Sequence, residues 1–253
     1  MKKNKIALTL VCAILLVAAS VMGTLAYLTS TSEAVVNTFT VGANVAIKLD
    51  EAKTNGAGEY LKKSVDENGN VIKDDDGDIE YEVTTVKTDA ERVIANSYTL
   101  FPGHEYKKDP TVHVQGGDCY VFIKVENIIS DSVLDDDSIN TQMAKNHWKA
   151  VDAAKYPGLY VYDETTGTTV GKTVVNKGTA SEKDLVIFEY FKIKSSATHD
   201  NIKNLNNTTL TINAYAVQAD GFGSMSAAKT FTTAFPTVYT ATTPSGGSEG
   251  GTT

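Results

Sequence analysis

The chain has 253 residues, with 31 acidic and 23 basic side chains and a formal net charge of −8 at pH 7. This acidic balance argues against binding to nucleic acids or anionic lipid head groups, because like charges repel. Of the two cysteines, Cys12 lies in an apolar N-terminal segment and Cys119 in the body of the chain. A lone thiol cannot form an internal disulfide, so we predict a fold held together by its apolar core.

The N-terminus has the three parts of a secretory signal peptide. Lysines crowd the first five residues, and residues 6–22 are almost entirely apolar. Thr24 and Ala26 supply the small side chains that a signal peptidase requires, so we expect cleavage between Ala26 and Tyr27 and a role outside the cytoplasm. The alternative is retention as an anchor, since about 18 apolar residues can cross a bilayer. The small residues at its end and the lack of a following basic cluster favour cleavage.

Residues 27–240 are predicted to form one β-rich domain, followed by a disordered Gly-, Ser- and Thr-rich tail at 241–253. Residues 35–41 and 45–49 alternate with period two, which indicates two strands separated at Gly42. Residues 54–82 are polar and contain Asn68-Gly69 and Asp76-Gly77, dipeptides typical of two-residue hairpin turns with positive φ at both positions. We predict that 54–82 is an exposed β-meander inserted into the domain.

The longest apolar stretch of the domain, residues 119–127, is apolar on nearly both faces, which predicts a central strand with Cys119 as a small buried residue. Residues 210–219 place Leu210, Ile212, Ala214 and Ala216 on one face of a further strand.

One helix is predicted, within residues 131–151, because Ile139, Met143, His147 and Val151 recur at every fourth position. Many short strands with one helix indicate an all-β fold, an antiparallel two-sheet sandwich of jelly-roll type.

Two N-terminal motifs carry a family resemblance. Gly-Thr-Leu-Ala-Tyr-Leu-Thr stands at 23–29, and Asn-Thr-Phe-Thr-Val-Gly stands at 37–42. Together they resemble the start of the TasA/camelysin family, secreted proteins of monoderm bacteria that are released by the signal peptidase SipW. Weaker similarity to core strands of the family extends the resemblance to about residue 235; it lies in Leu100–Gly103, Lys108–Val112, Cys119–Asn127 and Ala214–Phe222.

The resemblance implies a jelly-roll domain that serves as a fibre subunit at the cell surface or in a biofilm matrix. In such fibres the N-terminal segment of one subunit enters the sheet of the next, and here this assembly strand contains Val35, Asn37, Phe39 and Val41. The alternative is that the segment completes the sheet of its own chain. The implied partners are a SipW-type signal peptidase, further copies or sibling subunits, and matrix polysaccharide. The insertion at 54–82 departs from the shorter loop of the family.

Camelysin-type members are described as metalloproteases, which provides an enzymatic alternative. The His-Glu-x-x-His motif of zinc peptidases begins here as His104-Glu105, but position 108 is Lys and flanking prolines exclude a long helix. The remaining histidines, His113, His147 and His199, are scattered, although His104 and His113 could meet across a hairpin. We therefore predict a protein without enzymatic activity or cofactor.

The sequence contains candidate residues for two further ligand classes, calcium and carbohydrate. Asp74, Asp76 and Asp78 are weak calcium candidates, but an EF-hand register places Ile72 and Val83 at positions that should be acidic. A solvated acidic turn is the default interpretation. An aromatic set would suit a carbohydrate-binding or adhesin-like surface module, although core packing is the usual role of such residues in a sandwich; the set is Tyr81, Tyr98, Tyr106, Trp148, Tyr160 and Tyr162.

Overall fold

The computed structural model describes residues 29–32, 40–41, 45–135, 139–167, 169–205 and 208–239. The predicted signal peptide, its cleavage site and the C-terminal tail lie outside the described residues, as does most of the predicted assembly strand. Within the described residues, no helix is long and apolar enough to span a membrane.

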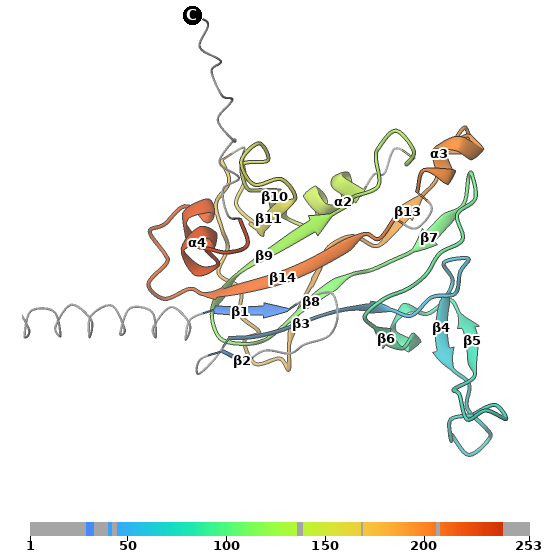
Figure 1. Cartoon of the computed structure of the whole chain (residues 1–253). Helices are drawn as coiled ribbons and strands as arrows, with labels where there is room; N and C mark the ends of the chain where they lie inside the picture. The colour runs from blue at the N-terminus through green and yellow to red at the C-terminus, as the bar shows by residue number, and fades with distance from the viewer. Residues whose placement is uncertain are drawn as a thin grey trace, which may run out of the picture.

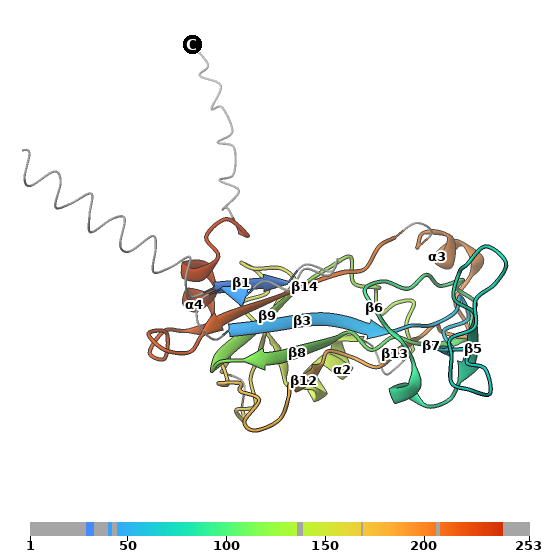
Figure 2. The ribbon, with the colours of Figure 1, turned by 90° about the horizontal axis from the view of Figure 1, so that it is seen from below.

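Two antiparallel sheets pack face to face (Figures 1 and 2). The first contains, in spatial order, β1 (Thr29–Ser32), β14 (Thr211–Gln218), β9 (Cys119–Glu126), β11 (Leu159–Tyr162) and β10 (Trp148–Ala150). The second contains β12 (Lys183–Val186), β8 (Thr111–Gly116), β3 (Val45–Ala52) and β2 (Thr40–Val41), and β6 (Arg92–Val93) pairs with the end of β3. Two smaller sheets pair β7 (Glu105–Lys107) with β13 (Tyr190–Lys192), and β4 (Tyr60–Lys63) with β5 (Tyr81–Thr84). The predicted antiparallel sandwich is confirmed.

Strand β9 is buried on both faces, as its sequence predicts. Val121 and Ile123 belong to the core between the two sheets, together with Ile212 and Ala214 of β14. On the opposite face, Phe122 belongs to a second core, which is covered by α4 (Ala227–Ala234). Both neighbours of β9 are strands, so it is a central strand of the first sheet.

Helix α4 was not predicted from the sequence. It begins after Ser226, whose hydroxyl accepts a hydrogen bond from Lys229 N and so satisfies a free N–H of the first turn. Phe231 anchors the helix: it is fully buried, with its ring centroid 5.3 Å from that of Phe122 and 5.2 Å from that of Tyr215. Within the part of the chain that the structure describes, the other helical elements are α2 (Ile139–Lys145), α3 (His199–Lys203) and the 3₁₀ turn η1 (Lys87–Asp89).

The helix predicted within 131–151 is present only as α2 (Ile139–Lys145), so the prediction is wrong beyond Lys145. Ile139 and Met143 do face the core. His147, however, has φ of 66°, a left-handed conformation that ends the helix. Trp148 then begins β10 and donates its indole N–H to the Val186 carbonyl oxygen at 2.9 Å. The hydrogen bond from this indole to β12 holds Trp148 in a strand, although the periodicity of the sequence is helical.

Residues 54–82 project from the end of the sandwich that lies opposite α4 (Figures 1 and 2). Three loops of the same form shape this insertion, at 55–59, 66–70 and 74–78. In each, the first residue is Asn or Asp and the fourth is Gly, and the side-chain oxygen of the first accepts hydrogen bonds from the third and fifth backbone N–H groups. These are three-residue hairpin loops with a left-handed glycine.

The predicted two-residue turns are therefore wrong. Gly69 and Gly77 have φ of 82° and 87°, but Asn68 and Asp76 do not have positive φ. The carboxylates of Asp66 and Asp74 stabilise the longer loop, because each binds two backbone N–H groups that a two-residue turn would place elsewhere.

The hairpins meet in two closed rings of backbone hydrogen bonds. In the first, Lys53 N donates to Glu91 O, Glu91 N to Leu61 O and Leu61 N to Lys53 O, at 2.7 to 3.1 Å. In the second, Ser64 N donates to Glu80 O, Glu80 N to Ile72 O and Ile72 N to Ser64 O. The insertion is thus two three-way strand junctions, and not a simple meander.

Candidate functional site

The N-terminal segment lies at the edges of both sheets. Strand β1 pairs with β14 in a continuous antiparallel register, from Thr29 opposite Val217 to Ser32 opposite Ala214. Strand β2 pairs with β3 at the edge of the second sheet, where Val41 lies opposite Val45. In this structure the described part of the segment therefore completes the sheets of its own chain. Figure 1 shows β1 beside β14 at the edge of the first sheet, on the side of β14 away from β9.

Most residues of the predicted export and assembly sites lie outside this description. Within the assembly strand, only the backbone of Val41 is described; Val35, Asn37 and Phe39 are not. The cleavage-site residues Thr24, Ala26 and Tyr27 are also outside the described residues.

β14 presents a complete strand edge to β1. Its residues alternate between the two cores: Ala214 and Ala216 pack between the sheets, and Tyr215 and Val217 pack beneath α4. All four side chains are buried, so the position of β14 is fixed by packing. Removing β1 would leave the backbone groups on this edge unpaired, and such an edge accepts a strand from another chain.

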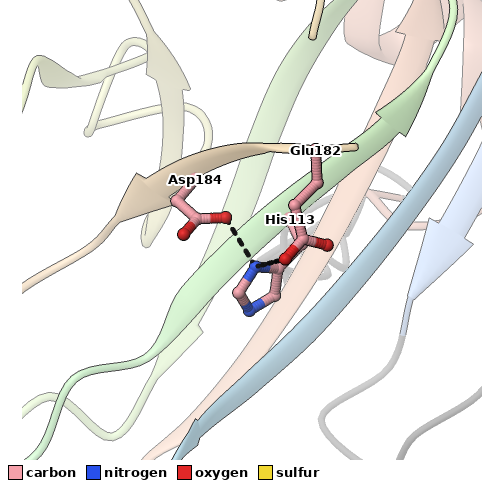
Figure 3. Close-up of side chains that lie close together, drawn as sticks. All are labelled: His113, Glu182 and Asp184. Carbon is pink, nitrogen blue, oxygen red and sulfur yellow. Dashed lines mark hydrogen bonds and ion pairs between the residues drawn. The ribbon is translucent and has the colours of Figure 1, made fainter. Parts of the chain in front are cut away.

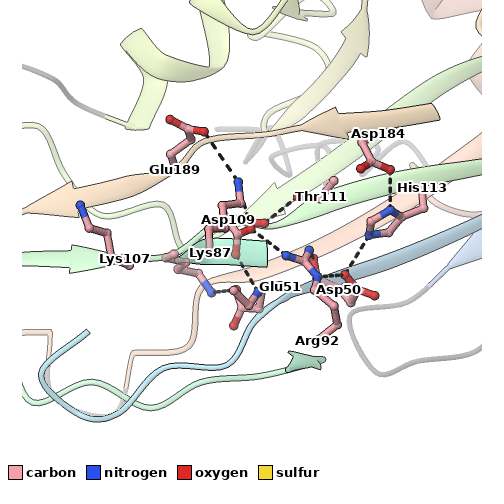
Figure 4. Close-up of polar contacts among 12 residues, drawn as sticks. Asp50, Glu51, Lys87, Arg92, Lys107, Asp109, Thr111, His113, Asp184 and Glu189 are labelled. Atoms are coloured by element: carbon pink, nitrogen blue, oxygen red, sulfur yellow. Dashed lines mark hydrogen bonds and ion pairs between the residues drawn. The ribbon is translucent and has the colours of Figure 1, made fainter. Parts of the chain in front are cut away.

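A charged network lies at the second sheet, around Arg92 of β6 (Figure 4). Its guanidinium Nε lies 2.6 Å from Asp50 Oδ1, and its Nη1 lies 2.7 Å from Asp109 Oδ2. Both carboxylates are almost completely buried. Asp109 Oδ1 also accepts a hydrogen bond from Ala52 N at 2.7 Å, so the network ties β3, β6 and the start of β8 together.

The pKa values follow from these contacts. Burial alone would raise the pKa of Asp50, but hydrogen bonds from His113 and Lys48 and the charge and hydrogen bond of Arg92 outweigh burial and hold this pKa well below its usual range. Burial likewise acts to lower the pKa of Arg92, and the two carboxylates outweigh it and raise that pKa. Asp50 and Arg92 are therefore both ionised at neutral pH, and loss of one partner would leave an unpaired buried charge.

His113 extends this network across β8 toward β12. Its Nε2 lies 2.9 Å from Asp50 Oδ1, and its Nδ1 lies 2.7 Å from Asp184 Oδ1 and 3.4 Å from Glu182 Oε1. Burial would lower the pKa of His113, but the hydrogen bonds to Asp50 and Asp184 outweigh it and raise this pKa. Sequence reasoning singled out neither Glu182 nor Asp184, because no local motif joins them to a histidine 71 residues away from Asp184.

The other histidines are placed separately. His104 precedes β7; its Nε2 lies 2.8 Å from the Ala57 carbonyl oxygen, and its ring packs against Tyr106. Strand β7 pairs with β13, whereas β8 pairs with β12 and β3, so His104 and His113 do not face each other across a hairpin. Glu105 lies on β7 and not on a helix, unlike the glutamate of a zinc-peptidase motif. His147 packs edge-on against Tyr162. The side chain of His199 is outside the described residues.

The calcium candidates do not form a common site. Asp74 Oδ1 accepts hydrogen bonds from the backbone N–H groups of Asp76 and Asp78, at 3.0 and 2.9 Å, and so serves its own loop. Among the described residues, one group of three His, Cys, Asp or Glu side chains has ligand atoms within 4.8 Å of one another, namely His113, Glu182 and Asp184.

The aromatic candidates are largely core residues. Tyr106, Trp148 and Tyr162 are buried, and Tyr98 packs edge-on against Tyr106 and Phe191. These six side chains therefore do not form one exposed platform for a sugar. Cys119 is buried, as predicted, and burial raises the pKa of its thiol to about 12, so it is not a nucleophile at neutral pH.

Comparisons with protein-family models, with curated proteins and with solved structures found no match for this chain.

Proposed function

We propose that this chain is an exported, non-enzymatic structural protein of the cell surface or biofilm matrix, which forms fibres by exchanging its N-terminal strand between subunits. The observation that carries the proposal is the position of β1, a four-residue strand at the outer edge of the first sheet with β14 as its paired neighbour. The signal-like N-terminus and the TasA/camelysin-like motifs around it support export through a SipW-type peptidase.

Exchange of such an edge strand costs little free energy. A donated segment makes with β14 of another chain the same backbone hydrogen bonds that it makes within its own chain. Exchange therefore replaces contacts by identical contacts, and its equilibrium depends on protein concentration. The intramolecular pairing must open first, so we expect slow polymerisation that preformed fibres accelerate.

The first test compares two forms of the protein, one beginning at Tyr27 and one beginning at Val41. We expect the longer form to give concentration-dependent polymers in light scattering and electron microscopy. The shorter form should stay monomeric and be less stable, because β14 has lost its edge partner. If the longer form remains monomeric at every concentration and truncation leaves the stability unchanged, strand exchange is wrong.

A second test asks whether the strand that pairs with β14 comes from the same chain or from another chain. Ser30 and Ala216 are register partners, and the Cα atoms of such a pair lie about 5 Å apart, within the range of a disulfide. In the variant Ser30→Cys/Ala216→Cys, oxidation before assembly should give a monomer that no longer polymerises. Oxidation after assembly should give a ladder of covalent oligomers on a non-reducing gel. The single variant Ser30→Cys is the control. Polymers whose cross-links are all intramolecular would point to a different assembly surface.

A further inference from the structure

The side chains of Glu182 and Asp184 converge on one nitrogen of His113, as Figure 3 shows. Asp184 lies on β12 directly opposite His113 of β8, and Glu182 precedes Asp184 by two residues and so points to the same side of the strand. The His113 side chain is 10% exposed, whereas that of Asp184 is 57% exposed and that of Glu182 is 36% exposed. The three ligand atoms therefore lie at a site that is closed on the sheet side and open to solvent.

The spacing of these atoms suits a metal ion of tetrahedral preference. Zinc binds nitrogen and oxygen ligands at about 2.0–2.1 Å, which separates two ligands of a tetrahedron by about 3.3 Å. The distance from His113 Nδ1 to Glu182 Oε1 is already 3.4 Å. Asp184 Oδ1 lies closer, at 2.7 Å, and must move outward by about half an ångström, which its exposed side chain permits.

Two of the three ligands have supporting hydrogen-bond partners. His113 directs its other nitrogen, Nε2, at Asp50 Oδ1, and Gln115 donates its side-chain amide to Glu182 Oε2 at 3.3 Å. A metal-binding histidine commonly donates its second N–H to a carboxylate, which fixes the tautomer and the orientation of the ring. Here Asp50 is held in turn by Arg92 and Lys48, which neutralise it and keep it in this supporting role.

The same hydrogen bond decides what His113 offers at its other nitrogen. With Nε2 directed at Asp50, Nδ1 is the nitrogen that can bind a metal ion; in the metal-free structure it lies 2.7 Å from Asp184 Oδ1, a hydrogen-bond distance, so a bound metal ion would displace the Nδ1 proton. A divalent cation would take the place of that proton between Nδ1 and the two carboxylate oxygens, whose ligand atoms lie within 4.8 Å of one another. Imidazole and carboxylate ligands together suit zinc and related divalent transition metals better than calcium or magnesium.

We propose that His113, Glu182 and Asp184 bind a divalent transition-metal ion, with zinc as the best match, and that this ion pins β12 to β8. The ion joins residues about 70 positions apart in the sequence and leaves one coordination position to water. Its role is structural, and it is independent of strand exchange at β1, which lies in the other sheet.

The test uses the protein that begins at Tyr27, freed of metal by a chelator. We expect isothermal titration calorimetry to show one zinc ion bound per chain and the melting temperature to rise on zinc addition. Cobalt(II) at the site should give the intense visible absorption of tetrahedral coordination. The variants Asp184→Asn and Glu182→Gln should each weaken zinc binding at least 10-fold, since each removes one of three protein ligands.

The control variant is Glu189→Gln, which removes an exposed carboxylate a few residues further along the same segment and should leave zinc binding unchanged. Circular dichroism before metal addition verifies that each variant is folded. Zinc binding that is absent, or that Asp184→Asn and Glu182→Gln leave as tight as in the unsubstituted chain, would overturn the proposal. His113 would then be a protonated structural residue within the charged network.

Discussion

Gly58 lies against the backbone of Tyr106: a Cβ atom at position 58 would come within 2.6 Å of the Tyr106 Cα. Lys107 N donates to the Gly58 carbonyl oxygen at 3.0 Å across the same contact. Tyr106 is fully buried, and its hydroxyl donates to Thr99 O and accepts from Phe101 N. The first loop of the insertion is thereby fixed to β7 and to the core of the sandwich.

Gly58→Ala should therefore destabilise the protein strongly. Gly58 has φ of 75°, so any other residue is strained there, and the new methyl group would press on the Tyr106 backbone. We expect a loss of about 3 kcal/mol in the free energy of unfolding, from strain and overpacking together. Urea denaturation measures it.

Gly69→Ala is the matched control. Gly69 occupies the same position of an equivalent loop with φ of 82°, but no atom lies within 4 Å of a Cβ placed on it. The loss should be about 1 kcal/mol, from the left-handed conformation alone. Equal losses for the two variants would show that the contact with Tyr106 does not matter.

Asp163 should make stability depend on acid pH. Its carboxylate is fully buried and accepts hydrogen bonds from Lys149 Nζ at 2.9 Å, Gly171 N at 2.8 Å and Thr165 Oγ1 at 2.6 Å. Burial would raise the pKa of Asp163, but the bonds from Thr165, Lys149 and Gly171 outweigh it and lower this pKa from 3.8 to about 2. The ionised form therefore stabilises the folded state.

The contribution of Asp163 is complete above pH 4 and is lost as the pH falls toward 2, because protonation there occurs first in the unfolded chain. Its size is at most about 2 kcal/mol. Urea denaturation between pH 6 and pH 2 should show Asp163→Asn less stable than the unsubstituted chain at pH 6. The difference between their free energies of unfolding should become smaller toward pH 2. Asp75→Asn, in an exposed loop, serves as a control and should run parallel to the unsubstituted chain. A gap that stays constant with pH would contradict the assigned role.

Phe231 should contribute most of the attachment of α4. Its ring packs against Phe122, Tyr215 and Phe235, and truncation leaves a cavity among aromatic side chains. We expect Phe231→Ala to cost about 3–5 kcal/mol in thermal or urea unfolding. Lys229→Ala, on the exposed side of the same helix, should change stability by less than about 0.5 kcal/mol. A small loss for Phe231→Ala would mean that α4 does not protect the outer face of the first sheet.

Cys119 should be inert to thiol reagents in the folded protein. It is fully buried, its Sγ lies 3.7 Å from the Val175 carbonyl oxygen, and burial raises its pKa to about 12. Labelling with a chromogenic disulfide reagent at pH 8 should therefore proceed at the rate at which the core opens, and become fast in 6 M guanidinium chloride. Fast labelling of the folded chain would require an open path to β9.

Strands were predictable where the pattern of apolar side chains matches burial on one or both faces of a sheet. Residues 45–49, 119–127 and 210–219 form β3, β9 and β14 for this reason. Strands β12 and β13 lie close together in the sequence but pair with different partners, β12 with β8 and β13 with β7. Pairing of this kind depends on distant residues, and the local pattern does not contain it.

The candidate sites were less predictable than the strands. The convergence of Asp184 and Glu182 on His113 depends on the register between β8 and β12, which no spacing in the sequence reveals. The repeated loops of the insertion could have been found, since Asn or Asp stands three positions before each of Gly58, Gly69 and Gly77. That interval is the signal that distinguishes them from two-residue turns.

The two rings of backbone hydrogen bonds make the insertion tolerant of change. Each ring closes through main-chain atoms of its own three residues, so its geometry does not depend on which side chains the loop tips carry. The tips at 67–68 and 75–76 lie beyond the second ring and are exposed. A foreign epitope placed there would be displayed at the end of the molecule far from α4, while the sandwich keeps its shape.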